Sequence, residues 1–147
     1  MSEVLTPSTR VQKGHGDAWL SFVLSGRMSR SQYGRRERTA EVNLRELLRL
    51  SNIDPALPPQ LTALARLAAD ENLSDGPAAI TWLRNRLTHP KDAAEPYRIK
   101  GLVVEAWRLA VEYQTLRLLH RVGYDGAYIP LTRIGGWAHD RVSVPWR

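Results

Sequence analysis

Apolar residues recur at three- and four-residue steps in four segments of the chain, which is the spacing of one face of an α-helix. The four segments are residues 35–50, 59–71, 76–88 and 96–122. Breaks rich in proline, asparagine and aspartate follow the first and second of them, as "NIDPALPP" and "NLSDGP". This succession of amphipathic helices and short breaks predicts an all-α fold, a four-helix bundle or a near relative of one.

The last of these segments predicts the longest helix. Its apolar face is expected to contain Ile99, Leu102, Val103, Ala106, Leu109, Ala110, Tyr113, Leu116 and Leu119. At ~1.5 Å per residue, a helix over this segment is roughly 40 Å long, enough to be the spine of a bundle. Gly123 is predicted to end it, because glycine readily adopts the left-handed conformation that follows a last helical turn. For the helix over 76–88, Asp75 or Ser74 is the expected cap, with Pro77 in the first turn.

The two ends of the chain differ in composition from the amphipathic segments between them. Residues 1–34 are rich in glycine, serine and threonine around one apolar run, "AWLSFVL" at 18–24. They predict an irregular N-terminal arm in front of a helical domain of residues 35–147. Residues 123–147 are rich in glycine, aromatic and β-branched residues. They predict an extended tail packed on the helices, with a short hairpin around Gly135 and Gly136.

The composition narrows the class of protein. With 147 residues, 43% of them hydrophobic and 24% charged, the chain is expected to be one folded domain. No apolar run approaches the ~20 residues of a membrane-spanning helix. The start, "MSEVLTPSTR", lacks the apolar stretch of a signal peptide, so a cytoplasmic location is expected. The absence of cysteine excludes disulfides, thiolate metal sites and cysteine nucleophiles, and neither a metal nor a cofactor is expected.

The balance of charge favours an anionic partner, nucleic acid first. The chain has 21 Lys and Arg against 15 Asp and Glu, a net charge of +6, and nearly all of its cations are arginines. The planar guanidinium suits contact with phosphate. Residues 27–49 hold the densest positive charge, which could line an RNA-binding face. A solvated helix flank is the common alternative for such a run, and the sequence leaves both open.

The segment "LRNRLTHP", residues 83–90, combines groups that could form a chemical site. Arg84 and His89 are five residues apart, which on a continuing helix places them about 140° apart around the axis. Pro90 disfavours helical geometry at His89, so the helix is expected to end there and the imidazole can turn back. Asn85, four residues before His89, can share its face. An Arg-Asn-His convergence at the helix end is therefore possible.

Such a trio suits cleavage of RNA without a metal. Histidine can accept the 2′-OH proton as the ribose oxygen attacks the adjacent phosphate, and arginine can stabilise the charge that develops on phosphate oxygens. Asparagine can orient the imidazole. The alternative is structural, because a basic side chain near the last carbonyls of a helix stabilises the helix dipole. The spacing of these residues alone does not decide between a catalytic and a structural role.

The segment "LRNRLTHP" resembles the Arg-Asn-x-x-x-His motif of HEPN domains. The following "VVEAWRLAVEYQTLRLLHRVGYDGAYI" is similar to the C-terminal HEPN region of ApeA-type anti-phage and abortive-infection proteins. The resemblance covers roughly residues 40–130. It implies a four-helix-bundle-like module that is a metal-independent endoribonuclease, a hydrolase with a toxin or antiviral-defence role. Arg84 and His89 then match the catalytic pair, and Asn85 the polar residue that follows the arginine.

The resemblance also implies partners. Two copies of the motif usually face each other across a homodimer, which makes a composite RNA-cleaving site. An antitoxin or a regulatory domain is a further possible partner. The cations that flank the motif and could contact the RNA backbone are Arg86, Lys91 and Arg98, although the motif itself assigns them no role. The alternative function is a non-catalytic HEPN-like module that binds RNA, a nucleotide or a protein and acts in regulation.

Overall fold

The structure is a computed structural model that describes residues 39–92, 94–133 and 141–147. The expected N-terminal arm and the expected turn at Gly135 and Gly136 lie outside these residues. In chain order the described elements are α2 (Ala40–Leu50), α3 (Thr62–Asp70), α4 (Gly76–Thr88), the 3-10 helix η1 (Glu95–Tyr97), α5 (Leu102–Arg121), β1 (Ala127–Tyr128) and β2 (Val142–Ser143). The prediction of an all-α fold is confirmed.

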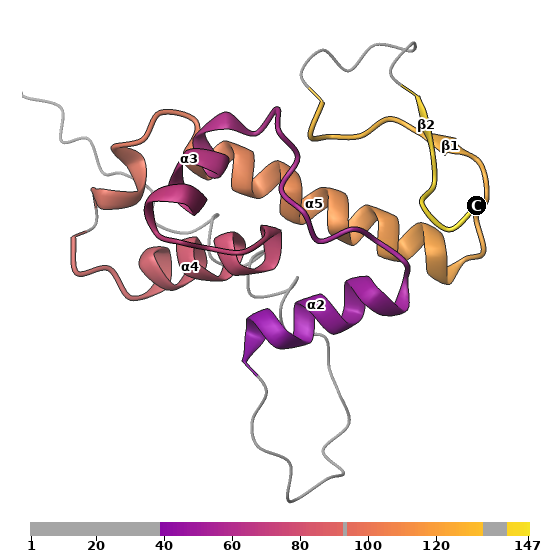
Figure 1. Ribbon diagram of the computed structural model, residues 1–147, viewed down its shortest axis with the longest axis horizontal. Coiled ribbons are helices and arrows are strands. Elements are labelled where there is room, and N and C mark those ends of the chain that lie inside the picture. The colour runs from indigo at the N-terminus through magenta and orange to yellow at the C-terminus, as the bar shows by residue number, and fades with distance from the viewer. Residues whose placement is uncertain (1–38, 93, 134–140) are drawn as a thin grey trace, which may run out of the picture.

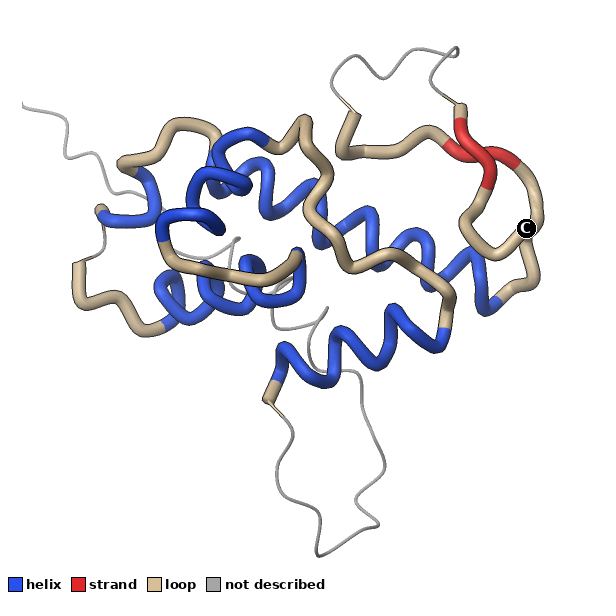
Figure 2. The backbone as a smooth tube through the Cα atoms, in the orientation of Figure 1, coloured by secondary structure: helices blue, strands red, loops and turns tan. Residues whose placement is uncertain are grey.

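Helix α5 is the spine of the molecule (Figure 1). Helices α2 and α4 lie along one side of it and contact each other, and α3 packs against both α4 and α5. The two short strands pair near the C-terminal end of α5, as the tube in Figure 2 makes clear. The loop between α4 and α5, which contains η1, therefore lies at the opposite end of α5 from the strands (Figure 1).

The first helix begins later than the periodicity predicts. Thr39 is extended, with φ −60° and ψ 156°, and its hydroxyl accepts a hydrogen bond from the Val42 N–H at 3.3 Å. This side-chain cap starts α2 at Ala40 rather than at residue 35. Leu44 and Leu48, four residues apart, are buried, whereas Val42 and Leu50 are 42% and 59% exposed. The last two lie about 160° and 240° from Leu44 around the axis, so they lie outside the buried face of α2.

The segment predicted as one helix from 96 to 122 is two elements. Residues 95–97 form η1, and Gly101 has φ 87°, a left-handed conformation that interrupts the chain before α5 begins at Leu102. The apolar spacing continues through Ile99, which is half-buried against the core, so the periodicity gave no sign of the break. At the other end Gly123 has φ 69° and follows the last turn, as predicted.

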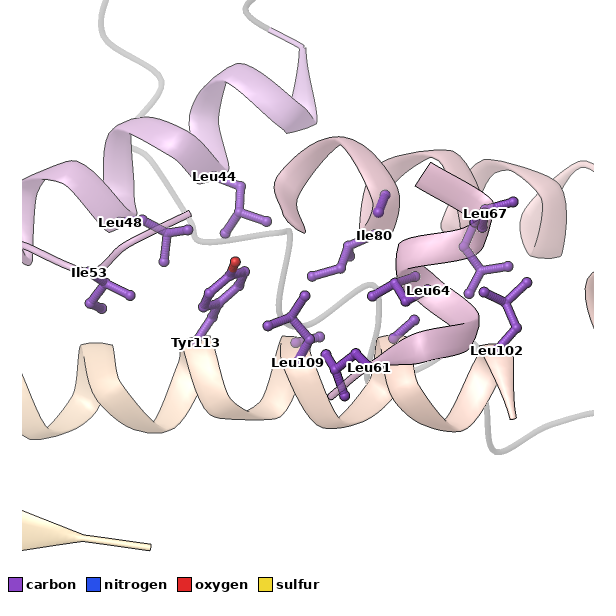
Figure 3. Packing of buried hydrophobic residues seen from close by; sticks show 14 of the residues in the cluster. Leu44, Leu48, Ile53, Leu61, Leu64, Leu67, Ile80, Leu102, Leu109 and Tyr113 are labelled. Atoms are coloured by element: carbon purple, nitrogen blue, oxygen red, sulfur yellow. The ribbon is translucent and has the colours of Figure 1, made fainter. Parts of the chain in front are cut away.

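One core joins the four α-helices of the described residues. The buried side of α5 is formed by Leu102, Ala106, Leu109, Ala110, Tyr113 and Leu116. Figure 3 shows Tyr113 rising from α5 toward Leu44 and Leu48 of α2, with Leu109 beside it. The Tyr113 hydroxyl donates to the Pro55 carbonyl at 3.0 Å. Burial raises the pKa of this phenol, because the ionised form would lose its hydration.

The described parts of the tail, residues 124–133 and 141–147, are largely extended and pack on the helices, as predicted. Strands β1 and β2 are antiparallel, with Tyr128 opposite Val142. Glu112 of α5, only 9% exposed, accepts hydrogen bonds from the Thr132 N–H at 2.8 Å and the Tyr128 hydroxyl at 3.3 Å. The chain after β1 is thus tied to the spine helix by a buried carboxylate.

Candidate functional site at the end of α4

Helix α4 has the predicted bounds and the predicted cap. Asp75 is its N-cap and accepts from the Ala78 N–H at 2.9 Å. The helix ends at Thr88, and His89 has φ −128° and ψ 60°, outside the helical region as expected before Pro90. The His89 N–H still donates to the Asn85 carbonyl at 2.9 Å, so the backbone closes the last turn. The imidazole therefore lies beyond the helix end, on an exposed residue.

The structure brings Arg84 and Asn85 together. Nη1 of Arg84 donates to Oδ1 of Asn85 at 3.2 Å. Nε of Arg84 is buried and has no hydrogen-bond partner among the described residues. Within the same residues, the structure places no hydrogen bond on the His89 side chain. Two members of the expected trio are therefore in contact, whereas the structure shows no hydrogen bond between the His89 side chain and either of them.

Two of the flanking cations are held in ion pairs. Nη1 of Arg86 lies 2.9 and 3.0 Å from the two carboxylate oxygens of Glu95. The guanidinium also lies 4.6 Å from the centre of the Trp82 ring, a cation–π distance. Nη2 of Arg98 donates to Asp92 at 2.5 Å. Arg86 thus connects α4 to η1, whereas Arg98 pairs within the loop between α4 and α5.

Lys91 behaves differently from these arginines. It is exposed and forms no ion pair within the described part of the chain. Arg84 likewise has no carboxylate partner there. The end of α4 therefore carries two kinds of cation, those paired with Glu95 and Asp92 and those without a carboxylate partner among the described residues.

The described part of the arginine-rich run at 27–49 is also ion-paired. Arg45 contacts Asp75 at 2.5 and 3.0 Å and Glu41 at 2.5 Å. The hydrogen bond to Asp75 raises the pKa of Arg45. Arg49 pairs with Glu46 at 2.8 Å. Ion pairing within the fold therefore accounts for Arg45 and Arg49. The other arginines of the run lie outside the described residues.

An open pocket of about 760 Å³ lies beside this run. It is lined by Val42, Arg45, Glu46, Arg49, Asn52, Ile53, Asp54, Pro55 and Pro145. Sequence reasoning missed it, because Pro145 is far along the chain from the others and no local pattern connects them. None of the helices in the described ranges is long and apolar enough to cross a membrane.

Comparison with known proteins overturns the resemblance to HEPN domains. The matching family model is the YopA C-terminal domain, over residues 18–143. No curated protein and no solved structure matches the chain. The identification as a HEPN domain of the ApeA type is wrong, since the match is to a different family and no HEPN family is found. The motif misled because a basic residue, a polar residue and a histidine before proline also end an ordinary helix. Because the match spans most of the chain, the protein belongs to the YopA C-terminal domain family.

Proposed function

We propose that the C-terminal end of α4 binds the phosphate backbone of RNA, with Arg84 and Lys91 as the contacting cations. The observation that supports this proposal is that only some of the cations at this end of α4 are paired with carboxylates. Arg86 and Arg98 are neutralised by carboxylates at 2.5 to 3.0 Å, whereas Arg84 and Lys91 have no such partner within the described residues. The net charge of +6 supports an anionic partner in general.

The arrangement around Arg84 supports this proposal in detail. Asn85 occupies one guanidinium nitrogen, and the buried Nε–H lacks an acceptor among the described residues. An unsatisfied buried donor costs about 1–3 kcal/mol. A phosphate oxygen would relieve that cost if the side chain turned outward, and the guanidinium could then make the two parallel hydrogen bonds that suit phosphate.

A second candidate is metal-independent cleavage of the bound RNA. The exposed imidazole of His89 favours it, because histidine can remove a proton near neutral pH and this one lies beyond the helix end. The ribose 2′-oxygen would lose its proton to His89 and attack the adjacent phosphorus, and the leaving 5′-oxygen would take up a proton. The products would be a 2′,3′-cyclic phosphate and a 5′-hydroxyl. A homodimer would supply the second proton-transfer group from the other copy of the site.

Binding is tested with a fluorescent single-stranded RNA, measured by anisotropy at several salt concentrations. Arg84→Ala and Lys91→Ala should each weaken binding and reduce the salt slope by about 0.7 for each phosphate that the variant no longer neutralises. Arg66→Gln is the matched control, because it removes one positive charge from a 78% exposed side chain on α3. If both variants bind like the wild type, or if the wild type does not bind at moderate salt, the proposal is wrong.

Cleavage is tested separately, with end-labelled RNA in EDTA. Wild-type protein should yield the cyclic phosphate product, and His89→Ala should remove the activity while RNA binding stays within about twofold of the wild type. A substrate with a 2′-deoxyribose at the cleaved position should bind and remain intact. Binding without any cleavage would reject the second candidate and leave the first in place.

A further inference from the structure

The loop between α4 and α5 presents a tyrosine ring to solvent. Tyr97 is the last residue of η1 and is 65% exposed. The other tyrosines within the described ranges, Tyr113, Tyr124 and Tyr128, each donate a hydroxyl hydrogen bond to an oxygen of the fold. The Tyr97 hydroxyl forms no such bond within those ranges. Neither burial nor hydrogen bonding therefore explains why an aromatic residue lies at this position.

Tyr97 is nevertheless held in a defined position. Pro96, directly before it, is buried, and Ile99 is half-buried against the core. Glu95 is joined to Arg86 of α4 by the ion pair described above. The exposed ring is thus carried by a turn that is anchored on both sides of it. A ring displayed in this way loses little conformational freedom when a ligand binds to it, which favours binding.

The same loop places this ring near a cation of the proposed RNA site. Arg98 follows Tyr97 in the chain and donates a hydrogen bond to Asp92. Asp92 directly follows Lys91, so this contact brings the segments that carry the ring and the lysine close together. Lys100, three residues beyond the ring, is also exposed and has no ion pair in the described part of the chain. One loop therefore carries an exposed aromatic ring and two lysines without carboxylate partners in that part.

We infer that Tyr97 stacks on an unpaired base of the RNA, so that this site selects single-stranded over duplex RNA. The inference rests on the proposed binding of phosphates by Arg84 and Lys91. An aromatic face can stack on any base, whereas the bases of a duplex are already stacked on each other and are out of reach. Trp82, an aromatic residue of α4, already has the guanidinium of Arg86 over its ring at 4.6 Å. Tyr97, which is more exposed, is the ring that a base can reach.

The test compares three RNA ligands of equal length by fluorescence anisotropy with the full chain: a single strand, an abasic single strand and a duplex. Wild-type protein should bind the single strand most tightly. Tyr97→Ala should weaken this binding about 5-fold or more and leave the salt slope unchanged, because no phosphate contact is lost. The same variant should bind the abasic strand and the duplex within about twofold of the wild type, since neither offers a base to the ring. Tyr97→Trp should retain binding of the single strand. Val122→Ala, which shortens a 77% exposed apolar side chain at the other end of α5, is the control, and circular dichroism checks that each variant is folded.

The outcomes separate this inference from the proposed function. If Arg84→Ala and Lys91→Ala weaken binding while Tyr97→Ala binds the single strand like the wild type, stacking is wrong and phosphate binding stands. A loss in Tyr97→Ala that is equally large for the abasic strand also overturns the inference, because the loss would then not depend on a base. Duplex RNA bound as tightly as the single strand by the wild type overturns the selection of single strands. If the wild type binds none of the three ligands, the proposed function and this inference both fail.

Discussion

Replacing Glu112, a buried carboxylate of α5, with alanine should destabilise the protein. The carboxylate is 9% exposed and accepts from the Thr132 N–H at 2.8 Å and from the Tyr128 hydroxyl at 3.3 Å. Thr132 is itself only 2% exposed. Alanine at this position leaves a buried backbone donor without an acceptor, and it releases the segment after β1 from the helix.

The size of the effect follows from these contacts. A hydrogen bond to a charged group contributes about 1.5–3 kcal/mol, and a buried donor left unsatisfied costs about 1–3 kcal/mol. The Tyr128 contact is long and half-buried, so it adds little. The free energy of unfolding of Glu112→Ala should therefore fall by about 2–4 kcal/mol. At about 4 °C for each kcal/mol in a domain of this size, the melting temperature should fall by roughly 8–16 °C.

Urea unfolding followed by circular dichroism measures this change, and hydrogen exchange of the Thr132 amide localises it. Glu112→Gln keeps an acceptor oxygen of the same shape, so it should lose only about 1 kcal/mol. Glu71→Ala, at an exposed position, is the control for loss of one carboxylate. Equal losses in the alanine and glutamine variants, or a loss below about 1 kcal/mol in the alanine variant, would refute the reasoning.

Three further changes test the packing around the start of α4. Burial raises the pKa of Tyr113, so the folded state holds the phenolic proton more tightly and stability should fall as the pH rises above about 10. Tyr113→Phe should flatten this fall and lose about 0.5–1.5 kcal/mol at pH 7, as measured by urea unfolding at both pH values. Gly76→Ala should destabilise by about 1–3 kcal/mol, because the added Cβ would overlap the Tyr113 hydroxyl and lie 3.1 Å from the Pro55 oxygen. A loss that is fully additive with Tyr113→Phe in the thermal melts would contradict that explanation. Asp75→Ala removes both the cap on Ala78 and the ion pair with Arg45, so it should lower stability by about 1–3 kcal/mol. Asp75→Asn keeps the capping oxygen and loses only the charge of the ion pair, so it should lose less, and equal melting temperatures of the two variants would refute the capping role.

The end of α4 could be predicted from the sequence, whereas the ion pairs of the cations around it could not. Pro90 ends α4 where the sequence places the end, because the conformational restriction acts on the preceding residue alone. The pairing of Arg86 with Glu95 depends instead on the path of the loop between two helices. No local pattern records which cations that loop neutralises. Only the tertiary structure therefore separates Arg84 and Lys91 from the other cations of this end.

The sequence by itself determined the helical class, the bounds and cap of α4, and the stop at Gly123, because these depend on interactions within a few residues. The tertiary structure decided the features that depend on distant segments. Glu105 of α5 accepts from the Leu64 N–H at 2.8 Å and so caps α3, whose own preceding residue provides no side-chain cap. Glu112 likewise fixes the tail. Each carboxylate looks like an ordinary helix-surface residue in the sequence, and its role exists only because the fold brings an unsatisfied N–H to it.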